Sequence, residues 1–177
     1  PRSQLKSIQH SWPNIDQYQY RAKKLLGAPQ EADKRIELAQ WCVERGMYEP
    51  AQTELQRALE VKRAHPKAVA MLGDLLETMG RTDAALAHYQ MWAEPSSEEL
   101  WWRMGEVLRK LGLHEAALEA YVKGSVSPLA FRSRSGQARM HAELETPAKA
   151  VEMVNDVFAK FSGDTKNFTP ELRTLAQ

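Results

Sequence analysis

Cysteine is almost absent from this chain of 177 residues, in which Cys42 is the only one. A single cysteine excludes an internal disulfide and favours a reducing compartment such as the cytoplasm. The first residues are polar and basic and lack the apolar stretch of a secretory signal. Because the chain begins at Pro1 rather than at a methionine, export after removal of a signal remains an alternative. We expect Cys42 to be a small buried hydrophobic residue.

Long apolar runs are missing, and so is an excess of charge of either sign. No stretch approaches the roughly 18 consecutive apolar residues that span a membrane, so membrane insertion is not expected. The 24 lysines and arginines are matched by 23 aspartates and glutamates, which gives a formal net charge of +1. Nucleic-acid-binding chains normally carry a basic excess, so this composition argues against a nucleic-acid partner.

The sequence also lacks the motifs of catalysis and of cofactor or metal binding. It has no glycine-rich phosphate loop, no zinc-binding histidine pair on a helix, and no nucleophile elbow. The five histidines are scattered without the spacing of metal ligands, at positions 10, 65, 88, 114 and 141. We therefore predict that the chain is not an enzyme, with no catalytic residue, no cofactor and no metal site.

What the chain does contain is a pattern that repeats after 34 and then after 32 residues. Five columns of similar residues keep this spacing: Leu38, Leu72 and Met104; Ala39, Gly73 and Gly105; Gly46, Gly80 and Gly112; Ala51, Ala85 and Ala117; Leu55, Tyr89 and Tyr121. A weaker fourth copy follows 33 residues later, at Ala138, Glu145, Ala150 and Val154. Such a period predicts stacked helical hairpins, because one hairpin cannot bury its apolar face alone.

Each column has a physical reason within a hairpin. Apolar residues recur at helical spacing, as in Leu100, Trp101, Met104, Val107, Leu108 and Leu111. A small residue at the position of Gly105 lets the two helices approach closely. A glycine at the position of Gly112 suits the left-handed turn that ends the first helix.

These residues resemble the tetratricopeptide-repeat family. The stretch Trp101-x-x-Met104-Gly105-x-x-Leu108, followed by Gly112, Ala117 and Tyr121, is close to the family pattern, and the resemblance covers about residues 32–158. It implies an all-α fold, a right-handed α-solenoid of antiparallel helix pairs with three to four repeats, flanking capping helices and a concave groove lined by the first helices. The chain departs from the pattern at Trp92, Gly124, Arg134 and Glu145. The carboxylate clamp of chaperone-binding members is missing, since the corresponding positions look like Ile36, Gln40, Met71 and Glu99, with only Arg103 basic.

The pattern divides the chain into three parts. Residues 1–30 form an N-terminal arm and a capping helix, in which Asn14 caps a helix from Ile15 to Leu26. Trp12, Ile15, Tyr18 and Leu25 are expected to cover the open face of the first repeat. Residues 31–161 form the repeat domain, with repeats at about 31–65, 66–96, 97–127 and 128–161. Helix starts are predicted by the capping box Ser96-x-x-Glu99, which follows Pro95, and by Thr146 before Pro147. Residues 162–177 are a C-terminal capping helix or the start of an extension.

Helix phase predicts which residues line the concave groove. Trp101 matches the packing aromatic of the family, and adjacent helical residues point about 100° apart. Trp102 therefore either faces the groove or packs on a neighbouring helix. The candidate partner-binding residues are Gln40, Glu44, Asp74, Glu77, Trp102, Glu106, Arg109, Arg132, Ser135 and Arg139.

The function that follows is a non-catalytic scaffold that binds a peptide or helix of a protein partner in this groove. The identity of the partner is not encoded in the pattern. Two alternatives remain. One is a structural scaffold that associates with itself, as a homo-oligomer. The other is a regulatory or substrate-presenting module of a larger multidomain protein.

Overall fold

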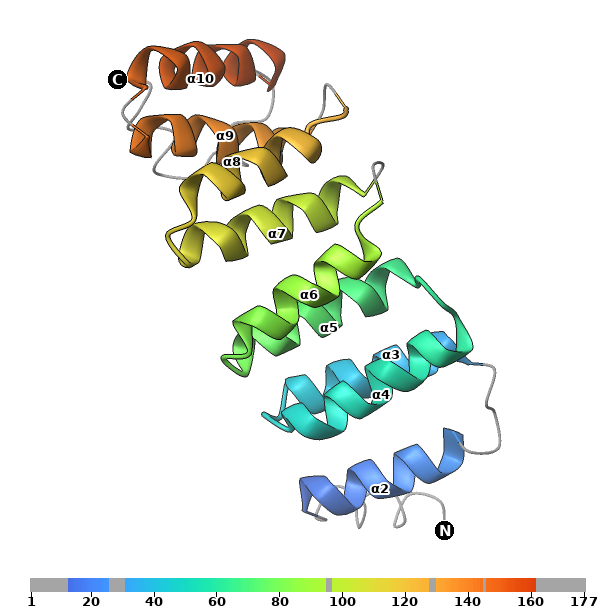
Figure 1. Ribbon diagram of the computed structural model, residues 1–177. Helices are drawn as coiled ribbons and strands as arrows, with labels where there is room; N and C mark the ends of the chain where they lie inside the picture. Colours follow the sequence, from blue (N-terminus) through green and yellow to red (C-terminus); the bar gives the residue numbers. More distant parts are fainter. Residues whose placement is uncertain (1–12, 26–30, 95–96, 128–129, 145, 162–177) are drawn as a thin grey trace. The chain divides into compact units, whose positions relative to one another are not determined.

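The computed structural model describes residues 13–25, 31–94, 97–127, 130–144 and 146–161. In these ranges the chain forms nine α-helices and no strand, as the sequence predicted (Figure 1). Their bounds are α2 Asn14–Leu25, α3 Ala32–Val43, α4 Tyr48–Val61, α5 Pro66–Thr78, α6 Thr82–Trp92, α7 Glu98–Lys110, α8 His114–Lys123, α9 Phe131–Glu143 and α10 Pro147–Phe161. The fold is an all-α helical solenoid. The predictions for Trp12, Leu26, Pro95, Ser96, Glu145 and residues 162–177 lie outside the described residues.

Three glycines end the first helices of successive pairs. Gly46, Gly80 and Gly112 have φ angles of 69°, 73° and 74°, in the left-handed region that glycine enters without a steric penalty. Each turn is closed by two backbone hydrogen bonds. In the third, the amide of Gly112 donates to the carbonyl of Arg109 (2.9 Å), and the amide of Leu113 donates to that of Leu108 (3.0 Å). The predicted left-handed turns are confirmed.

The described residues group into two compact units, residues 1–85 and 86–177, which we call the N-terminal and the C-terminal unit. In the N-terminal unit α3 packs against α4, α4 packs against α5, and α2 lies against α3. Helix α6 begins in this unit and continues into the C-terminal one. The core of this unit is built from Ile36, Ala39, Cys42, Ala51, Leu55, Ala58, Val69 and Leu76. Full burial of a large aliphatic side chain such as Ile36 or Leu55 contributes about 1.5–3 kcal/mol to the free energy of folding.

Helix α2 differs from the prediction at its first turn. It begins at Asn14, and the carbonyl of Pro13 accepts the amides of Asp16 and Gln17 (3.0 and 3.2 Å). Tyr18 and Leu25 are partly buried, as expected. The expectation for Ile15 is wrong, because all of residues 13–16 are exposed and Ile15 is 46% exposed.

In the C-terminal unit α8 packs between α7 and α9, α7 lies beside α9, and α10 covers α9. The fully buried ring of Tyr121, on α8, is held against two glycines. A Cβ atom on Gly105 of α7 or on Gly136 of α9 would come within 2.5 Å of that ring. The close approach predicted at Gly105 is confirmed, and a second one exists at Gly136. At the far side of α9, Ala138 is buried with Val154 and Val157 of α10.

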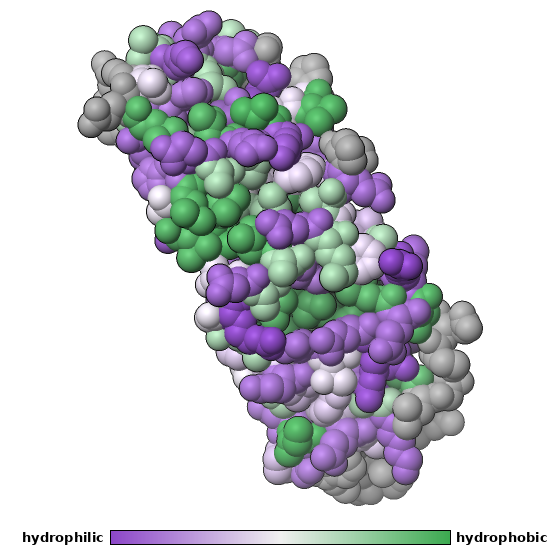
Figure 2. Space-filling model, in the orientation of Figure 1, coloured by the Kyte–Doolittle hydropathy of each residue, from purple (hydrophilic) through white to green (hydrophobic). Residues whose placement is uncertain are grey.

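The molecular surface is mostly polar on the face shown in Figure 2, with separate apolar patches. Exposed apolar side chains of the C-terminal unit include Met91, Leu111, Leu113, Val122 and Val126. No helix of the described ranges is long and apolar enough to cross a lipid bilayer.

Candidate functional site

The most concentrated set of predicted binding residues lies on α7 and α9 of the C-terminal unit. Trp102 of α7 lies beneath the Arg132 guanidinium of α9, whose central carbon is 4.8 Å from the ring centroid. The Arg103 guanidinium is 5.8 Å from the same ring. Glu99 accepts hydrogen bonds from Arg132 and forms an ion pair with Arg103, each at 3.0 Å. We call Glu99, Trp102, Arg103 and Arg132 the Trp102 cluster.

A second set of contacts centres on Glu106, one turn along α7. Its carboxylate accepts a hydrogen bond from the Tyr121 hydroxyl (2.7 Å) and one each from Arg109 (3.3 Å) and Arg139 (3.4 Å). Burial, followed by the hydrogen bond to Glu106, raises the pKa of Tyr121. Partial burial disfavours the charged form of Arg109, but Glu106 outweighs it, so the pKa of Arg109 also lies above its usual value. Tyr121 therefore stays protonated and Arg109 stays charged at neutral pH.

Together these contacts give the α7–α9 surface an aromatic ring and a positive excess. Four guanidiniums, of Arg103, Arg109, Arg132 and Arg139, lie beside the carboxylates of Glu99 and Glu106, and the charge of Glu143 also acts on Arg109. Trp102 is partly buried, and Arg132 keeps 60% of its side chain exposed. The arrangement can stack on a planar or cationic group and can bind a carboxylate. Trp102 contacts Arg132 of the neighbouring α9 and remains partly accessible.

The predicted residue Ser135 does not belong to this surface. Its side chain is buried, with 4% of the residue exposed, and its hydroxyl has no hydrogen-bond partner within the described structure. Helix phase was the only guide to Ser135, and the packing of α9 between α7, α8 and α10 turns this residue inward.

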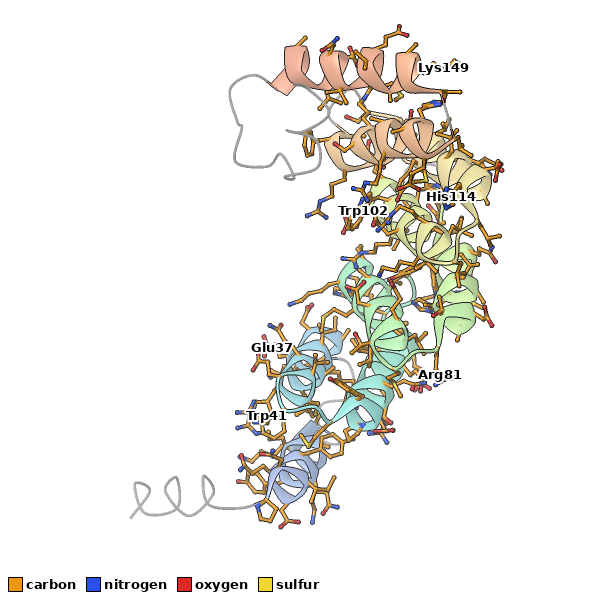
Figure 3. The ribbon with its side chains drawn as sticks, turned by 90° about the vertical axis from the view of Figure 1, so that its left-hand side faces the viewer. Glu37, Trp41, Arg81, Trp102, His114 and Lys149 are labelled. Carbon is orange, nitrogen blue, oxygen red and sulfur yellow. The ribbon has the colours of Figure 1, made fainter. Side chains whose placement is uncertain are left out.

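The other four predicted residues lie in the N-terminal unit, on the neighbouring helices α3 and α5. Gln40 is exposed on α3, Glu44 is exposed directly after it, and Asp74 and Glu77 are partly buried on α5. Figure 3 shows that Glu37 and Trp41, also on α3, point to one side of this unit, while Arg81 points to the other. The α3–α5 residues thus carry negative charge, in contrast to the positive excess between α7 and α9.

A further group of polar contacts, which helix phase did not single out, joins α2 to the first helix pair. The Tyr18 hydroxyl donates to the Glu54 carboxylate (3.1 Å), and the Arg21 guanidinium lies 4.5 Å from the Trp41 ring centroid. The Arg45 guanidinium lies 4.3 Å from the centroid of the same ring. Sequence spacing cannot show this group, because its members come from three different helices.

Glu54 is fully buried and is held by two arginines. Arg35 donates at 2.8 Å and Arg57 at 2.7 Å. Burial, and then the charge of Glu54, raise the pKa of Tyr18 to about 12. The same two causes raise the pKa of the fully buried Cys42 thiol to about 11. The prediction that Cys42 is a buried hydrophobic residue is confirmed.

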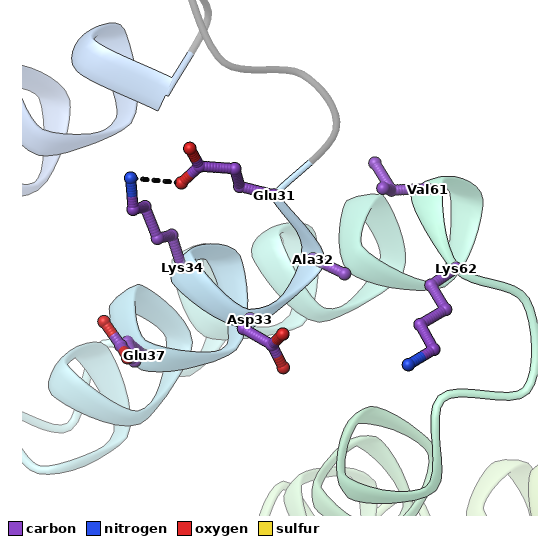
Figure 4. Close-up of a pocket in the computed structure, with 7 residues that line it drawn as sticks. All are labelled: Glu31, Ala32, Asp33, Lys34, Glu37, Val61 and Lys62. Atoms are coloured by element: carbon purple, nitrogen blue, oxygen red, sulfur yellow. Dashed lines mark ion pairs between the residues drawn. The ribbon is translucent and has the colours of Figure 1, made fainter.

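An open pocket of about 590 Å³ lies where α3 begins and α4 ends (Figure 4). It is lined by Glu31, Ala32, Asp33, Lys34, Glu37, Val61 and Lys62. Lys34 forms an ion pair with Glu31, so part of the lining charge is neutralised within the pocket.

Two histidines face carboxylates rather than a common centre. His65 Nε2 is 3.0 Å from Asp33 Oδ1, and His114 Nδ1 is 3.2 Å from Glu143 Oε2. Across the described ranges, no three residues of the types His, Cys, Asp and Glu converge in a way that could hold a metal ion.

Comparison with known proteins places this geometry among helical repeats. The profile of the tetratricopeptide repeat matches residues 98–124, which contain α7 and α8. No curated protein sequence matches the chain significantly.

Several solved structures share the fold. A crystal structure of MamA superposes with a TM-score of 0.69 at 19% identity, covering 84% of this chain and 89% of that one. PilF from Pseudomonas aeruginosa gives a TM-score of 0.64 at 20% identity, over 75% of this chain and 62% of that one. A chain of the Cut9–Hcn1 hetero-tetramer of the APC/C gives 0.63 at 17% identity, over 82% of this chain and 30% of that one.

Proposed function

The chain is a tetratricopeptide-repeat protein by its matched repeat and by its fold, and from this premise we propose that it is a non-catalytic module that binds a protein partner. Such proteins are generally non-catalytic scaffolds that bind protein partners. We assign two surfaces to the partner, each formed by first helices: α7 with α9 in the C-terminal unit, and α3 with α5 in the N-terminal unit. The ligand is a peptide or a helix of the partner.

The observation that carries the proposal is the Trp102 cluster. Tryptophan and arginine are the residue types that most often dominate binding energy at protein interfaces. Here Trp102 is held in place by Arg103 and Arg132, so its ring is positioned before a partner arrives and loses little freedom on binding. Groups held in this way are suited to anchor a ligand.

Charge indicates the kind of segment that the α7–α9 surface binds. Glu99 and Arg132 are both well exposed, and exposed ion pairs contribute only about 0–1 kcal/mol. A carboxylate of the partner can therefore replace Glu99 on the two guanidiniums at little cost. We infer that the segment seated on the Trp102 cluster is acidic. Gln40, Glu44, Asp74 and Glu77 would prefer a polar or basic segment and would help to set the register.

The experiment is a crosslinking pull-down with the full chain as bait. The test variant is Trp102→Ala with Arg132→Ala, and the matched control is Lys149→Ala, an exposed residue of α10 (Figure 3). We expect one partner to be captured by the wild type and the control and to be lost from the test variant. Helicity by circular dichroism must be equal for all three.

The proposal fails if the test variant captures the same proteins as the wild type. It also fails if the chain captures only itself, which would favour a self-associating scaffold. In that case light scattering would show a mass that rises with concentration, and the exposed apolar side chains of the C-terminal unit, such as Val122 and Val126, would be the first surface to mutate.

A further inference from the structure

Helix α2 is attached to the N-terminal unit without burying any residue completely. Only four of its side chains are partly buried, those of Gln17, Tyr18, Ala22 and Leu25. Its remaining residues are exposed, including Ile15 and Tyr20. A helix of 12 residues is marginal in water on its own, so α2 depends on this shallow contact. Helix α2 is therefore easier to displace than α3, α4 or α5, each of which buries several residues.

The surface that receives α2 stays satisfied when α2 leaves. Glu54 keeps its hydrogen bonds to Arg35 and Arg57, both from the first helix pair, and loses only the Tyr18 hydroxyl. A buried carboxylate that retains two charged donors is not left as an uncompensated charge. The receiving surface is therefore formed by α3 and α4 and does not require α2.

The aromatic part of the receiving surface is likewise preformed. Trp41 belongs to α3, and Arg45, in the turn that follows α3, stays on the ring at 4.3 Å. When α2 leaves, only the Arg21 guanidinium is withdrawn from Trp41. What is then exposed is a tryptophan that accepts a cation and, close by, a carboxylate that accepts a hydrogen bond.

We propose that this surface is a second protein-binding site, which takes a helix of a partner protein, and that α2 occupies it as an exchangeable stand-in. We call the pair Trp41 and Glu54, with the arginines that hold them, the α2 site. The side chains by which α2 occupies the site indicate which groups a partner helix must carry. Tyr18 and Arg21 are three residues apart and so share one helix face. The partner helix presents a hydrogen-bond donor and, three residues later, a guanidinium.

The α2 site disfavours a ligand helix that carries carboxylates in place of the hydrogen-bond donor and the guanidinium. A carboxylate at the Tyr18 position of the ligand would face the buried Glu54, and a carboxylate at the Arg21 position would face the negative side of the Trp41 ring. The site thus discriminates against a carboxylate at either of these two positions of the ligand helix. The α2 site lies in the N-terminal unit and the Trp102 cluster in the C-terminal unit, and the two proposals are independent.

Because α2 is tethered, it competes with any partner at a high effective concentration, in the millimolar range for short linkers. A partner helix therefore binds weakly to the wild-type chain and more tightly once α2 is weakened. This competition supplies the test.

The probe is a labelled synthetic peptide of residues 14–25, followed by fluorescence anisotropy against the full chain. We compare the wild type with Tyr18→Phe/Arg21→Ala, which removes both α2 contacts. The matched control is Gln19→Ala/Lys23→Ala, two exposed residues of the same helix. We expect the apparent affinity to rise at least tenfold in the test variant and to be unchanged in the control. Adding Trp41→Leu to the test variant should abolish the gain.

Several results would overturn the inference. Equal binding to all chains, including the one with Trp41→Leu, would show that the peptide binds elsewhere. No binding to any chain would show that α2 is a permanent cap. A dimer in light scattering that the peptide dissolves would assign the site to α2 of a second copy and not to a partner protein. If the double variant loses helicity, Arg21→Ala alone replaces it, with an expected gain of at least threefold.

Discussion

The thiol of Cys42 is fully buried in α3, and burial together with the nearby charge of Glu54 raises its pKa to about 11. The nucleophile is the thiolate, so at pH 8 the native thiol is almost entirely unreactive. We expect a thiol reagent to modify Cys42 at least about a hundredfold more slowly in the native chain than in denaturant. The stability due to the neutral thiol is present below its ordinary pKa and is lost as pH rises toward 11. Fast labelling under native conditions would contradict the buried position.

Adding a single methyl group at Gly105 should lower the free energy of unfolding through a steric clash. A Cβ atom there would lie 2.5 Å from the Tyr121 ring, so Gly105→Ala forces α7 and α8 apart. Overpacking of this kind typically costs about 1–3 kcal/mol. The measurement is the free energy of unfolding in urea. If replacing the ring by Tyr121→Leu does not reduce the cost of Gly105→Ala, the clash is not its cause.

Gly112 provides the contrast, because a Cβ atom there meets nothing within 4 Å. Its φ of 74° is instead the obstacle. We expect Gly112→Ala to cost about 1–2 kcal/mol through the backbone alone. Gly112→Asn should cost less, since asparagine tolerates the left-handed region better. Equal losses for the two variants in urea unfolding would argue against a backbone origin.

Among the elements, the link between α4 and α5 contains a strained residue. Ala64 has a φ of 58°, and it is the only non-glycine residue with positive φ in the part of the chain that the structure describes. Ala64→Gly removes the strain but adds freedom to the unfolded chain, so we expect a net gain of up to about 1 kcal/mol. Thermal unfolding measures it. A loss of stability would mean that the alanine methyl group contributes packing that outweighs the strain.

Helix α2 should respond to alkaline pH through Tyr18, whose pKa is raised to about 12 by burial and by Glu54. A raised pKa means that the protonated phenol is favoured in the docked state. The stabilisation is therefore complete below the ordinary tyrosine pKa of about 10 and is lost as pH rises from there toward 12. The difference in tyrosinate absorbance between the wild type and Tyr18→Phe should titrate near pH 12. A midpoint near 10 would show that Tyr18 does not contact Glu54.

The helices and their turns were predictable because their signals are local. The left-handed glycines, the start of α10 at Pro147 and the small residue at Gly105 each follow from spacings of a few residues or from the repeat period. The contacts that join helices were not predictable. Tyr18 meets Glu54 across 36 residues, and Tyr121 meets Gly136 outside the aligned columns.

The candidate site was predictable only in outline. Helix phase selected Trp102, Glu106, Arg109, Arg132 and Arg139. In the structure Arg132 contacts Trp102, and Arg109 and Arg139 contact Glu106, all on α7 and α9. Phase also placed Ser135 there, but phase alone does not report which neighbours cover a helix, and Ser135 is buried. Neither Glu99 nor Arg103 was selected as a binding residue, because Glu99 joins Arg103 of α7 to Arg132 of α9, and the contact between Glu99 and Arg132 depends on the distance between two helices.

For the whole molecule, unfolding should depart from a single two-state transition. The described residues group into two compact units, and helical repeats unfold as a set of neighbouring elements and not always as one. Cys42 reports on the N-terminal unit, and in a variant with Trp12→Phe and Trp41→Phe the remaining tryptophans, Trp92, Trp101 and Trp102, report on the C-terminal one. We expect the urea midpoints of thiol exposure and tryptophan fluorescence to differ. Coincident curves would indicate that the units unfold together.

The ring of Tyr121, pressed against Gly105 and Gly136, has a consequence for how such a chain can change over time. A methyl group at either glycine is harmful while the ring is present, and a smaller residue at 121 leaves a cavity while both glycines remain. The three positions are therefore inherited as a set, although 31 residues separate the first from the last. A repeat moved from this chain into another array must include α9. The hairpin of α7 and α8 contains the Tyr121 ring and Gly105, but the second glycine that packs on this ring, Gly136, belongs to α9.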